Sequence, residues 1–268
     1  MRELNHLSDI YKNYGTFVID LWGVIHNGVM LNSKAMKTIE QLKNNSKKIV
    51  FLSNAPRPSS QVIDFLVKIK MNKKYLSNVI TSGEAAMHAI NENRFGKNFF
   101  HLGPPRDTSV FEKVKNNKVE LKECDFILCT GLFDDYENDL QYYENFLKKY
   151  VSKKMVCTNP DLTVHRGNAE ELCAGSVAKV FEDLGGEVVY FGKPYREVYN
   201  LCFNPNEKVL AIGDNLRTDI KGANNLNIDS IFITNGVHRE EIKDITKLDT
   251  LLKKYKVKTN FFQKELTW

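Results

Sequence analysis

The sequence predicts an α/β fold with a parallel sheet, interrupted by a smaller inserted α/β unit. Short apolar runs alternate with stretches of helical periodicity, which is typical of parallel strands joined by helices. Several of these runs end directly in acidic or hydroxyl residues, as buried strands do at a sheet edge that carries chemistry. The middle of the chain has its own alternation of strands and helices, which indicates an insertion.

The first part of the chain is expected to begin with a short helix over residues 7–14. A buried strand over 16–19 then ends at Asp20, and the loop after it contains Trp22 and His26. The elements that follow are a helix at 33–45, a strand at 48–52, a helix at 59–70, a strand at 78–82 and a helix at 83–93.

The middle segment is expected to contain strands at 98–102, 124–129 and 154–157, with helices at 107–116 and 138–150. The first pattern then resumes with a strand at 187–191, a helix at 196–202, a strand at 208–212, a helix at 218–225 and a strand at 230–234. We therefore expect a core domain formed by residues 1–86 and 187–268, and an inserted domain formed by residues 87–186.

The composition is that of a soluble globular protein, with 42% hydrophobic and 26% charged residues. No apolar run approaches the ~20 residues of a membrane span, and the polar first residues do not resemble a secretory signal. The five cysteines are scattered without a CxxC pair, which argues against disulfides and zinc and favours a cytoplasmic location. The net charge of +5 is spread rather than gathered in a basic stripe, so we expect no nucleic-acid partner and no membrane partner.

Polar side chains follow four of the apolar runs that are expected to form the core sheet. They are Asp20, Ser53 with Asn54, Lys193, and Asp214 with Asp219 behind it. Parallel strands of one sheet share one carboxyl edge, so these groups are expected to converge there. Carboxylates bind Mg²⁺ through hard oxygen ligands, and a hydroxyl and an ammonium bind the non-bridging oxygens of a phosphate. One carboxylate, Asp20, is then available as a nucleophile that forms an aspartyl-phosphate.

Ordered motifs along the chain carry a family resemblance. They are Asp-Leu-Trp-Gly-Val from Asp20, Ser-Asn-Ala-Pro-Arg from Ser53, Thr-Asn-Pro-Asp from Thr158, Gly-Lys-Pro from Gly192 and Gly-Asp-Asn-Leu-Arg-Thr-Asp-Ile from Gly213. Together they resemble the haloacid dehalogenase (HAD) superfamily, and in particular its class IIA, or NagD-type, branch. The resemblance covers nearly the whole chain, and it implies a Rossmann-like core with an α/β cap inserted after the serine motif.

The resemblance also implies a nucleophile and a metal site. Asp20 would attack phosphorus. The Mg²⁺ ligands would be Asp20, the backbone carbonyl of Trp22 and Asp214. Asp219 would steady the water shell of the metal or the lysine.

Phosphate and substrate contacts are implied in the same way. Ser53 and Lys193 would hold the phosphate, with Asn54 supporting them. The cap would close over the substrate and select it, and the residues facing the cleft from that side would be Asn159, Asp161 and the helix start at Ala174–Ser176. Proteins of this branch often pair through their caps, so a homo-oligomer is one expected form.

One position departs from the family pattern. Typical phosphatases of this superfamily carry a second aspartate two residues after the nucleophile, and here that position is Trp22. The missing acid would protonate the leaving group and then activate water, which is typically worth ~10²–10⁴ in rate, and an indole has no useful proton to exchange near neutral pH. Three outcomes stay open: a slow or selective phosphatase, a substitute acid or base such as His26, or binding without turnover. The other interpretation of His26 is a loop histidine bonded to the backbone.

The sequence thus predicts a cytoplasmic, Mg²⁺-dependent HAD-type hydrolase that acts on a small phosphomonoester. The alternative is a pseudo-phosphatase that binds a phosphorylated metabolite in the same pocket. A dehalogenase also lacks the second acid but needs no metal, whereas Asp214 and Asp219 favour a metal site. Phosphonatase chemistry would need a Schiff-base lysine in the cap, and no lysine is singled out. Sugar phosphates, nucleotides and pyridoxal phosphate are all candidate substrates.

Overall fold

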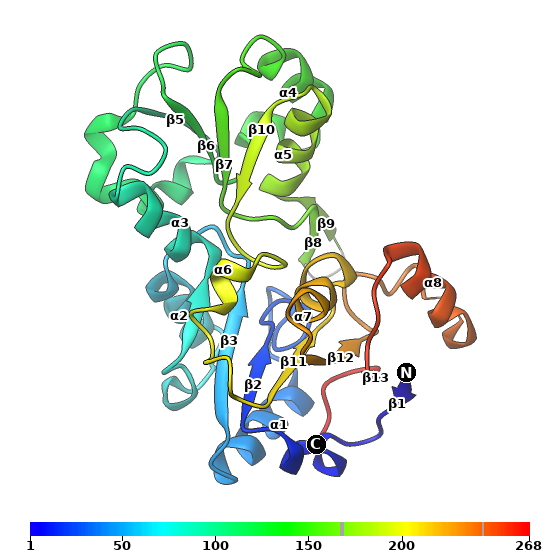
Figure 1. Cartoon of the computed structure of the whole chain (residues 1–268). Helices are drawn as coiled ribbons and strands as arrows, with labels where there is room; N and C mark the ends of the chain where they lie inside the picture. Colours follow the sequence, from blue (N-terminus) through cyan, green and yellow to red (C-terminus); the bar gives the residue numbers. More distant parts are fainter. Residues whose placement is uncertain (167–168, 243) are drawn as a thin grey trace.

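The computed structural model describes residues 1–166, 169–242 and 244–268, and its two parallel sheets lie one above the other in Figure 1. The larger sheet has seven strands in the order β1-β13-β12-β11-β2-β3-β4, and every pairing in it is parallel. Its strands are β1 (Arg2–Glu3), β2 (Thr16–Ile19), β3 (Lys48–Ser53), β4 (Val79–Thr81), β11 (Val209–Gly213), β12 (Asp229–Ile233) and β13 (Phe261–Gln263). The predicted α/β fold with a parallel core sheet is confirmed.

The strands β2 and β11 lie at the centre of the larger sheet and are buried at every position. From β2 the chain continues to β3 and β4 on one side, whereas β11, β12 and β13 extend the other side. The direction of strand addition therefore reverses between β2 and β11. In open α/β sheets, ligands bind at the carboxyl ends of the strands beside such a reversal.

Amphipathic helices cover the larger sheet. The first, α1 (Ser33–Asn44), turns Ile39 and Leu42 inward, and the side chain of Asn32 caps its first N–H groups. The other helices of this part are α2 (Ser59–Lys68), α6 (Arg196–Tyr199), α7 (Lys221–Leu226) and α8 (Leu248–Tyr255). Within the described residues, no helix has both the length and the apolar character that a bilayer crossing requires.

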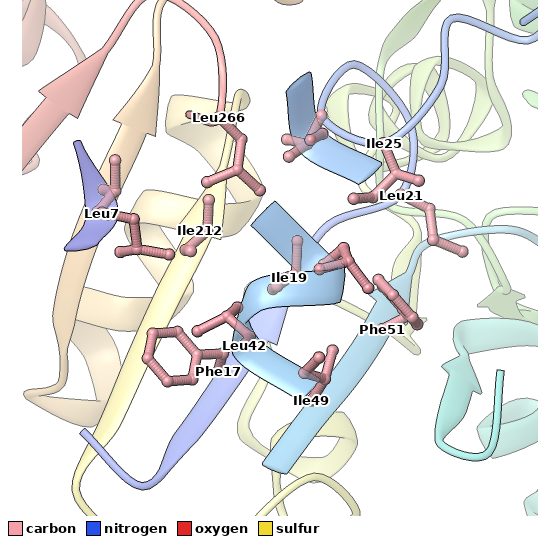
Figure 2. Close-up of a cluster of buried hydrophobic side chains, with 14 of the residues drawn as sticks. Leu7, Phe17, Ile19, Leu21, Ile25, Leu42, Ile49, Phe51, Ile212 and Leu266 are labelled. Carbon is pink, nitrogen blue, oxygen red and sulfur yellow. The ribbon is translucent and has the colours of Figure 1, made fainter. Parts of the chain in front are cut away.

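The apolar cluster between α1 and the sheet fixes the position of β2 (Figure 2). Phe17 and Ile19 of β2 pack there with Phe51 of β3 and Ile212 of β11, and all four are at most 1% exposed. Burial of such side chains stabilises the fold by roughly 1.5–3 kcal/mol each. The end of β2, where Asp20 begins, therefore rests on a tightly packed base.

The smaller sheet has the order β10-β7-β6-β5, also parallel throughout. Its strands are β5 (Phe99–Leu102), β6 (Phe126–Cys129), β7 (Lys154–Cys157) and β10 (Glu187–Tyr190). Apolar residues of α4 (Leu140–Leu147) and α5 (Ala174–Asp183) pack in one cluster on this sheet, and those of α3 (Ser82–Asn91) and the 3₁₀ segment η4 (Pro105–Asn117) pack in another. A two-stranded antiparallel hairpin, β8 (Thr163–Arg166) with β9 (Ala169–Leu172), lies between the two sheets in Figure 1.

The structure corrects one element of the predicted core. The strand expected at 187–191 is β10, which pairs with β7 at the edge of the smaller sheet and not with the larger sheet. Its apolar run signalled a strand correctly, but a run of this kind carries no information about which sheet it joins. Likewise, α3 packs its buried residues on the smaller sheet.

Several local expectations differ from the structure. The helix expected at 7–14 is two 3₁₀ turns, η1 (Leu7–Asp9) and η2 (Tyr11–Asn13), and the helix expected at 107–116 is the kinked 3₁₀ segment η4. The helix expected at 218–225 begins earlier, as a π-helical segment, η6 (Leu216–Ile220). Among the strands and α-helices, β1, β8, β9, α8 and β13 had no predicted counterpart, and of α5 only the start was expected.

Candidate active site

Three buried aspartates meet at the carboxyl ends of β2 and β11. Asp20 directly follows β2, Asp214 directly follows β11, and Asp219 lies in η6. One carboxylate oxygen of each lies within 4.8 Å of those of the other two. The reversal of strand order between β2 and β11 brings these side chains together, although they are far apart in the sequence.

Lys193 is the cation among them. Its Nζ lies 2.5 Å from Asp20 Oδ1 and 2.7 Å from Asp219 Oδ1, and its side chain is 4% exposed. Contrary to the prediction, it does not follow a strand of the core: it follows β10 of the smaller sheet. The side chain of Asn54 fixes its backbone, since Oδ1 accepts a hydrogen bond from the Lys193 N–H (2.8 Å) and Nδ2 donates to the Lys193 carbonyl (3.2 Å).

Asp214 is held through one of its two carboxylate oxygens. The N–H of Val237 donates to Oδ2 at 2.7 Å. Gly23, at φ +85°, comes so close that a side chain there would overlap the Asp214 carboxylate. Asp219 in turn accepts a hydrogen bond from the N–H of Asn215 (3.1 Å). Backbone N–H groups therefore hold one oxygen of each of these two carboxyl groups, and the other oxygen of Asp219 contacts Lys193.

The cluster gathers four acidic side chains and one basic one. Burial raises the pKa of Asp20, and it raises the pKa of Asp214 to about 8 and that of Asp161 to about 6, with neighbouring carboxylates adding to each effect. Burial alone would lower the pKa of Lys193, but the charges of Asp20 and Asp219 outweigh it and raise the pKa. Once ionised, four carboxylates around one ammonium leave an excess of negative charge that a divalent cation would balance. An all-oxygen donor set fits a hard ion such as Mg²⁺.

A residue that the sequence interpretation missed, His238, holds η6 in place. Its Nε2 accepts a hydrogen bond from the N–H of Leu216 (3.1 Å), and its Nδ1 donates to Glu241 (2.6 Å), which sets the tautomer. Glu241 also accepts hydrogen bonds from Lys254 and Tyr255, each at 2.7 Å. The sequence places His238 soon after the strand expected at 230–234, which was the available signal for it. Nothing in the sequence indicated that it would contact Leu216 of the motif that begins at Gly213.

Trp22 stands where the second acid was expected, and its side chain faces the hairpin β8–β9. The indole Nε1 donates to the carbonyl of His165 (2.7 Å), and the guanidinium of Arg166 lies 5.4 Å from the centroid of the ring. His26, the candidate substitute acid, is 4% exposed, and its Nδ1 accepts a hydrogen bond from the N–H of Gly28 (3.0 Å). Burial, together with the charge of Arg166, lowers the pKa of His26 to about 4. The structure therefore favours the loop histidine over a general acid.

A cleft of about 1,130 Å³ opens beside the cluster, between the larger sheet, the loops of the smaller sheet and the hairpin. Asp20, Ser53 and Lys193 line it from the side of the larger sheet. Arg57 lies on its wall and forms an ion pair with the buried Asp107 of η4 (Nε–Oδ1 2.7 Å), which joins the loop after β3 to the smaller-sheet unit.

The residues expected to face the cleft from the cap side divide into two groups. Asn159, Asp161 and Ala174 line the cleft. Asp161 accepts a hydrogen bond from Asn215 Nδ2 (3.1 Å), which links this side to the acidic loop. Gly175 and Ser176 do not line the cleft, and the Ser176 hydroxyl donates to the carbonyl of Leu162 at 2.6 Å.

Comparisons with known proteins point to one group of enzymes. A family model described as haloacid dehalogenase-like hydrolase matches residues 17–116, and a second, HAD-hydrolase-like, matches residues 190–256. The chain is 23% identical to the 5′-nucleotidase YutF of Bacillus subtilis, over 86% of this chain and 91% of that protein, and 23% identical to an acid sugar phosphatase of Staphylococcus saprophyticus, over 86% and 90%. The crystal structure of a haloacid dehalogenase-like hydrolase from Brucella suis superposes with a TM-score of 0.86 at 27% identity, over all of both chains.

Proposed function

Because this chain belongs to the haloacid dehalogenase-like hydrolases, we propose that it hydrolyses small phosphomonoesters through an aspartyl-phosphate on Asp20. The observation that carries the proposal is the buried cluster at the strand reversal, where the ammonium of Lys193 lies among Asp20, Asp214 and Asp219. A carboxylate nucleophile beside a cation and a hard-metal donor set is what phosphoryl transfer requires. The named activities of the two relatives, a 5′-nucleotidase and an acid sugar phosphatase, support a phosphoric monoester hydrolase.

The cation that we propose is Mg²⁺, held by Asp20, Asp214 and the backbone carbonyl of Trp22. Asp214 keeps one oxygen available for it, since the N–H of Val237 occupies the other. The contact between Asp219 and Lys193 supports the second of the two roles considered for Asp219, which is to steady the lysine. When bound, the ion would neutralise charge on the phosphoryl oxygens.

In the proposed reaction a carboxylate oxygen of Asp20 attacks phosphorus, the ester P–O bond breaks, and the leaving oxygen departs as an anion that takes its proton from solvent water. Ser53 and Lys193 hold the non-bridging oxygens, and water then cleaves the aspartyl-phosphate. Neither Trp22 nor His26 supplies a proton to the leaving oxygen, so we propose that aryl phosphates turn over faster than alkyl phosphates. The deficit for alkyl substrates is the usual contribution of a general acid, ~10²–10⁴ in rate.

We also propose a division of the chain into catalytic core and cap. The boundaries predicted at 86 and 187 fall inside α3 and at the start of β10, and both elements pack with the smaller sheet. We therefore place the cap at residues 82–191 and the core at residues 1–81 and 192–268. Pairing of two chains through their caps stays a prediction. All five cysteines are buried and free, which supports the cytoplasmic location that we propose.

The alternative, a pseudo-phosphatase, draws its support from Trp22. The test is a screen of 4-nitrophenyl phosphate, hexose phosphates, nucleoside monophosphates and pyridoxal phosphate, with Mg²⁺ or with EDTA. We expect Mg²⁺-dependent phosphate release, fastest from the aryl ester, and its loss in Asp20→Asn. Tight binding of inorganic phosphate without release from any ester, the aryl ester included, would overturn the enzyme and support the alternative.

A further inference from the structure

We propose that Trp22 is a positioning residue that ties the hairpin β8–β9 to the nucleophile loop and so sets the shape of the cleft at its leaving-group end. The inference rests on the proposed function of the same cleft. Position 22, which holds a tryptophan in place of the expected aspartate, then affects how the substrate fits in the cleft and takes no part in proton transfer.

The indole is held by four neighbours. Its N–H donates to the carbonyl of His165 at 2.7 Å, and the guanidinium of Arg166 lies 5.4 Å from the ring centroid. A side chain at Gly28, which has φ +84°, would collide with the ring, so the indole rests against the backbone of its own loop. The imidazole of His26 meets it edge to face, with ring centroids 5.0 Å apart. Trp22 is therefore fixed on the core side and presents its one donor to the hairpin.

The hairpin needs such a contact. It forms a sheet of only two strands, and its residues are exposed or half-buried. An isolated two-stranded hairpin is at best marginally stable in water. Its base is fixed to the cap, where Leu162 accepts hydrogen bonds from the Cys173 N–H (2.8 Å) and the Ser176 hydroxyl (2.6 Å). Trp22 approaches from the nucleophile loop, so the hairpin joins the two parts of the molecule across the cleft.

Aspartate at this position could not make the same contact. An aspartate side chain is too short to reach where the indole N–H lies, and in its ionised form it only accepts hydrogen bonds, so it would not replace the donor to the carbonyl of His165. Residue 22 can therefore serve proton transfer or hold the hairpin, but not both. Val164 and His165 line the cleft, so under the proposed function this contact would position hairpin residues against the substrate.

The experiment compares Trp22→Phe with Trp268→Phe, which changes the other tryptophan of the chain and is the matched control. Phenylalanine keeps an aromatic ring under Arg166 but removes the N–H. Amide hydrogen exchange is measured without substrate for the hairpin residues 163–166 and 169–172. Loss of one hydrogen bond of ordinary net strength should make amide exchange in the hairpin about 2- to 10-fold faster in Trp22→Phe. Exchange in β2 and β11 should stay unchanged, and Trp268→Phe should have no effect.

Kinetics with 4-nitrophenyl phosphate and Mg²⁺ supply the second readout. A positioning role predicts a KM raised by a similar factor in Trp22→Phe, with a smaller change in kcat. Unchanged hairpin exchange would overturn the proposal, and so would a fall in kcat at constant KM. If no variant releases phosphate from any ester, the proposed function fails, while the exchange measurement still decides the role of Trp22.

Discussion

Replacement of Asp214 by asparagine is expected to stabilise the metal-free protein while removing its response to Mg²⁺. Burial and the charge of Asp219 raise the pKa of Asp214 from 3.8 to about 8 in the folded protein. The unfolded chain releases this proton near pH 4, so the contribution of Asp214 to stability falls as the pH rises from about 4 to about 8. Ionisation of Asp214 in the unfolded chain thus lowers the free energy of unfolding by about 4 kcal/mol at pH 7 and by about 2 kcal/mol at pH 5. Asparagine has the same shape, and its carbonyl can still accept from the N–H of Val237.

The assay is urea unfolding in EDTA, at pH 7 and at pH 5, followed by circular dichroism. We expect Asp214→Asn to raise the free energy of unfolding by about 4 kcal/mol at pH 7 and by about 2 kcal/mol at pH 5. Asp64→Asn, at an exposed position of α2, is the control and should change it by less than about 0.5 kcal/mol. Added Mg²⁺ should then raise the unfolding midpoint of the wild type by mass action and leave that of Asp214→Asn where it was.

Two results would refute this reasoning. One is an Asp214→Asn variant that is no more stable than the wild type at pH 7 in EDTA. The other is a gain in stability of equal size at both pH values, because the linkage requires the gain to grow between pH 5 and pH 7.

Three further predictions follow from single positions. Trp22→Asp restores an acid and releases the hairpin, so with alkyl phosphates both kcat and KM should rise; an unchanged kcat in a folded variant would count against the missing acid as the cause of slow turnover. Gly23→Ala should abolish Mg²⁺-induced stabilisation, because its methyl group would overlap Asp214. The control Gly185→Ala is also at positive φ but has open space around it, so backbone strain should lower its free energy of unfolding by only roughly 1–2 kcal/mol. The pKa of buried His101 is lowered to about 4, so its contribution to stability is present above pH 6.5 and lost on acidification. Between pH 7.5 and pH 5, the free energy of unfolding in urea should therefore fall by about 2 kcal/mol less in His101→Gln than in the wild type. An equal fall in both proteins would contradict the buried neutral imidazole.

The core sheet could be predicted from the sequence because its strands carry their signal locally. β2, β3, β11 and β12 are short, nearly continuous apolar runs, as strands buried on both faces must be. The apolar run of β10 is of the same kind, yet the strand belongs to the smaller sheet. The hairpin β8–β9 was not predictable in this way, since its half-exposed strands have no apolar run.

The acidic groups of the candidate site could be anticipated because each stands at the end of a predictable strand or just beyond it. Contacts between distant segments could not. The hydrogen bond from Leu216 to His238 and the one from Trp22 to His165 each join residues whose local sequences give no sign of a partner. The role of Lys193 was inferred through a wrong strand assignment, and its position depends instead on Asn54.

The pair of hydrogen bonds between Asn54 and the backbone of Lys193 has a consequence for the modularity of this molecule. Lys193 follows a cap strand in the sequence, but its backbone is anchored in space to the loop after β3. An inserted unit of different length or shape could be grafted between β4 and Gly192 while Asp20 and Lys193 keep their spacing. Variation of the inserted unit and retention of the pair formed by Asp20 and Lys193 are thereby separated within one continuous chain.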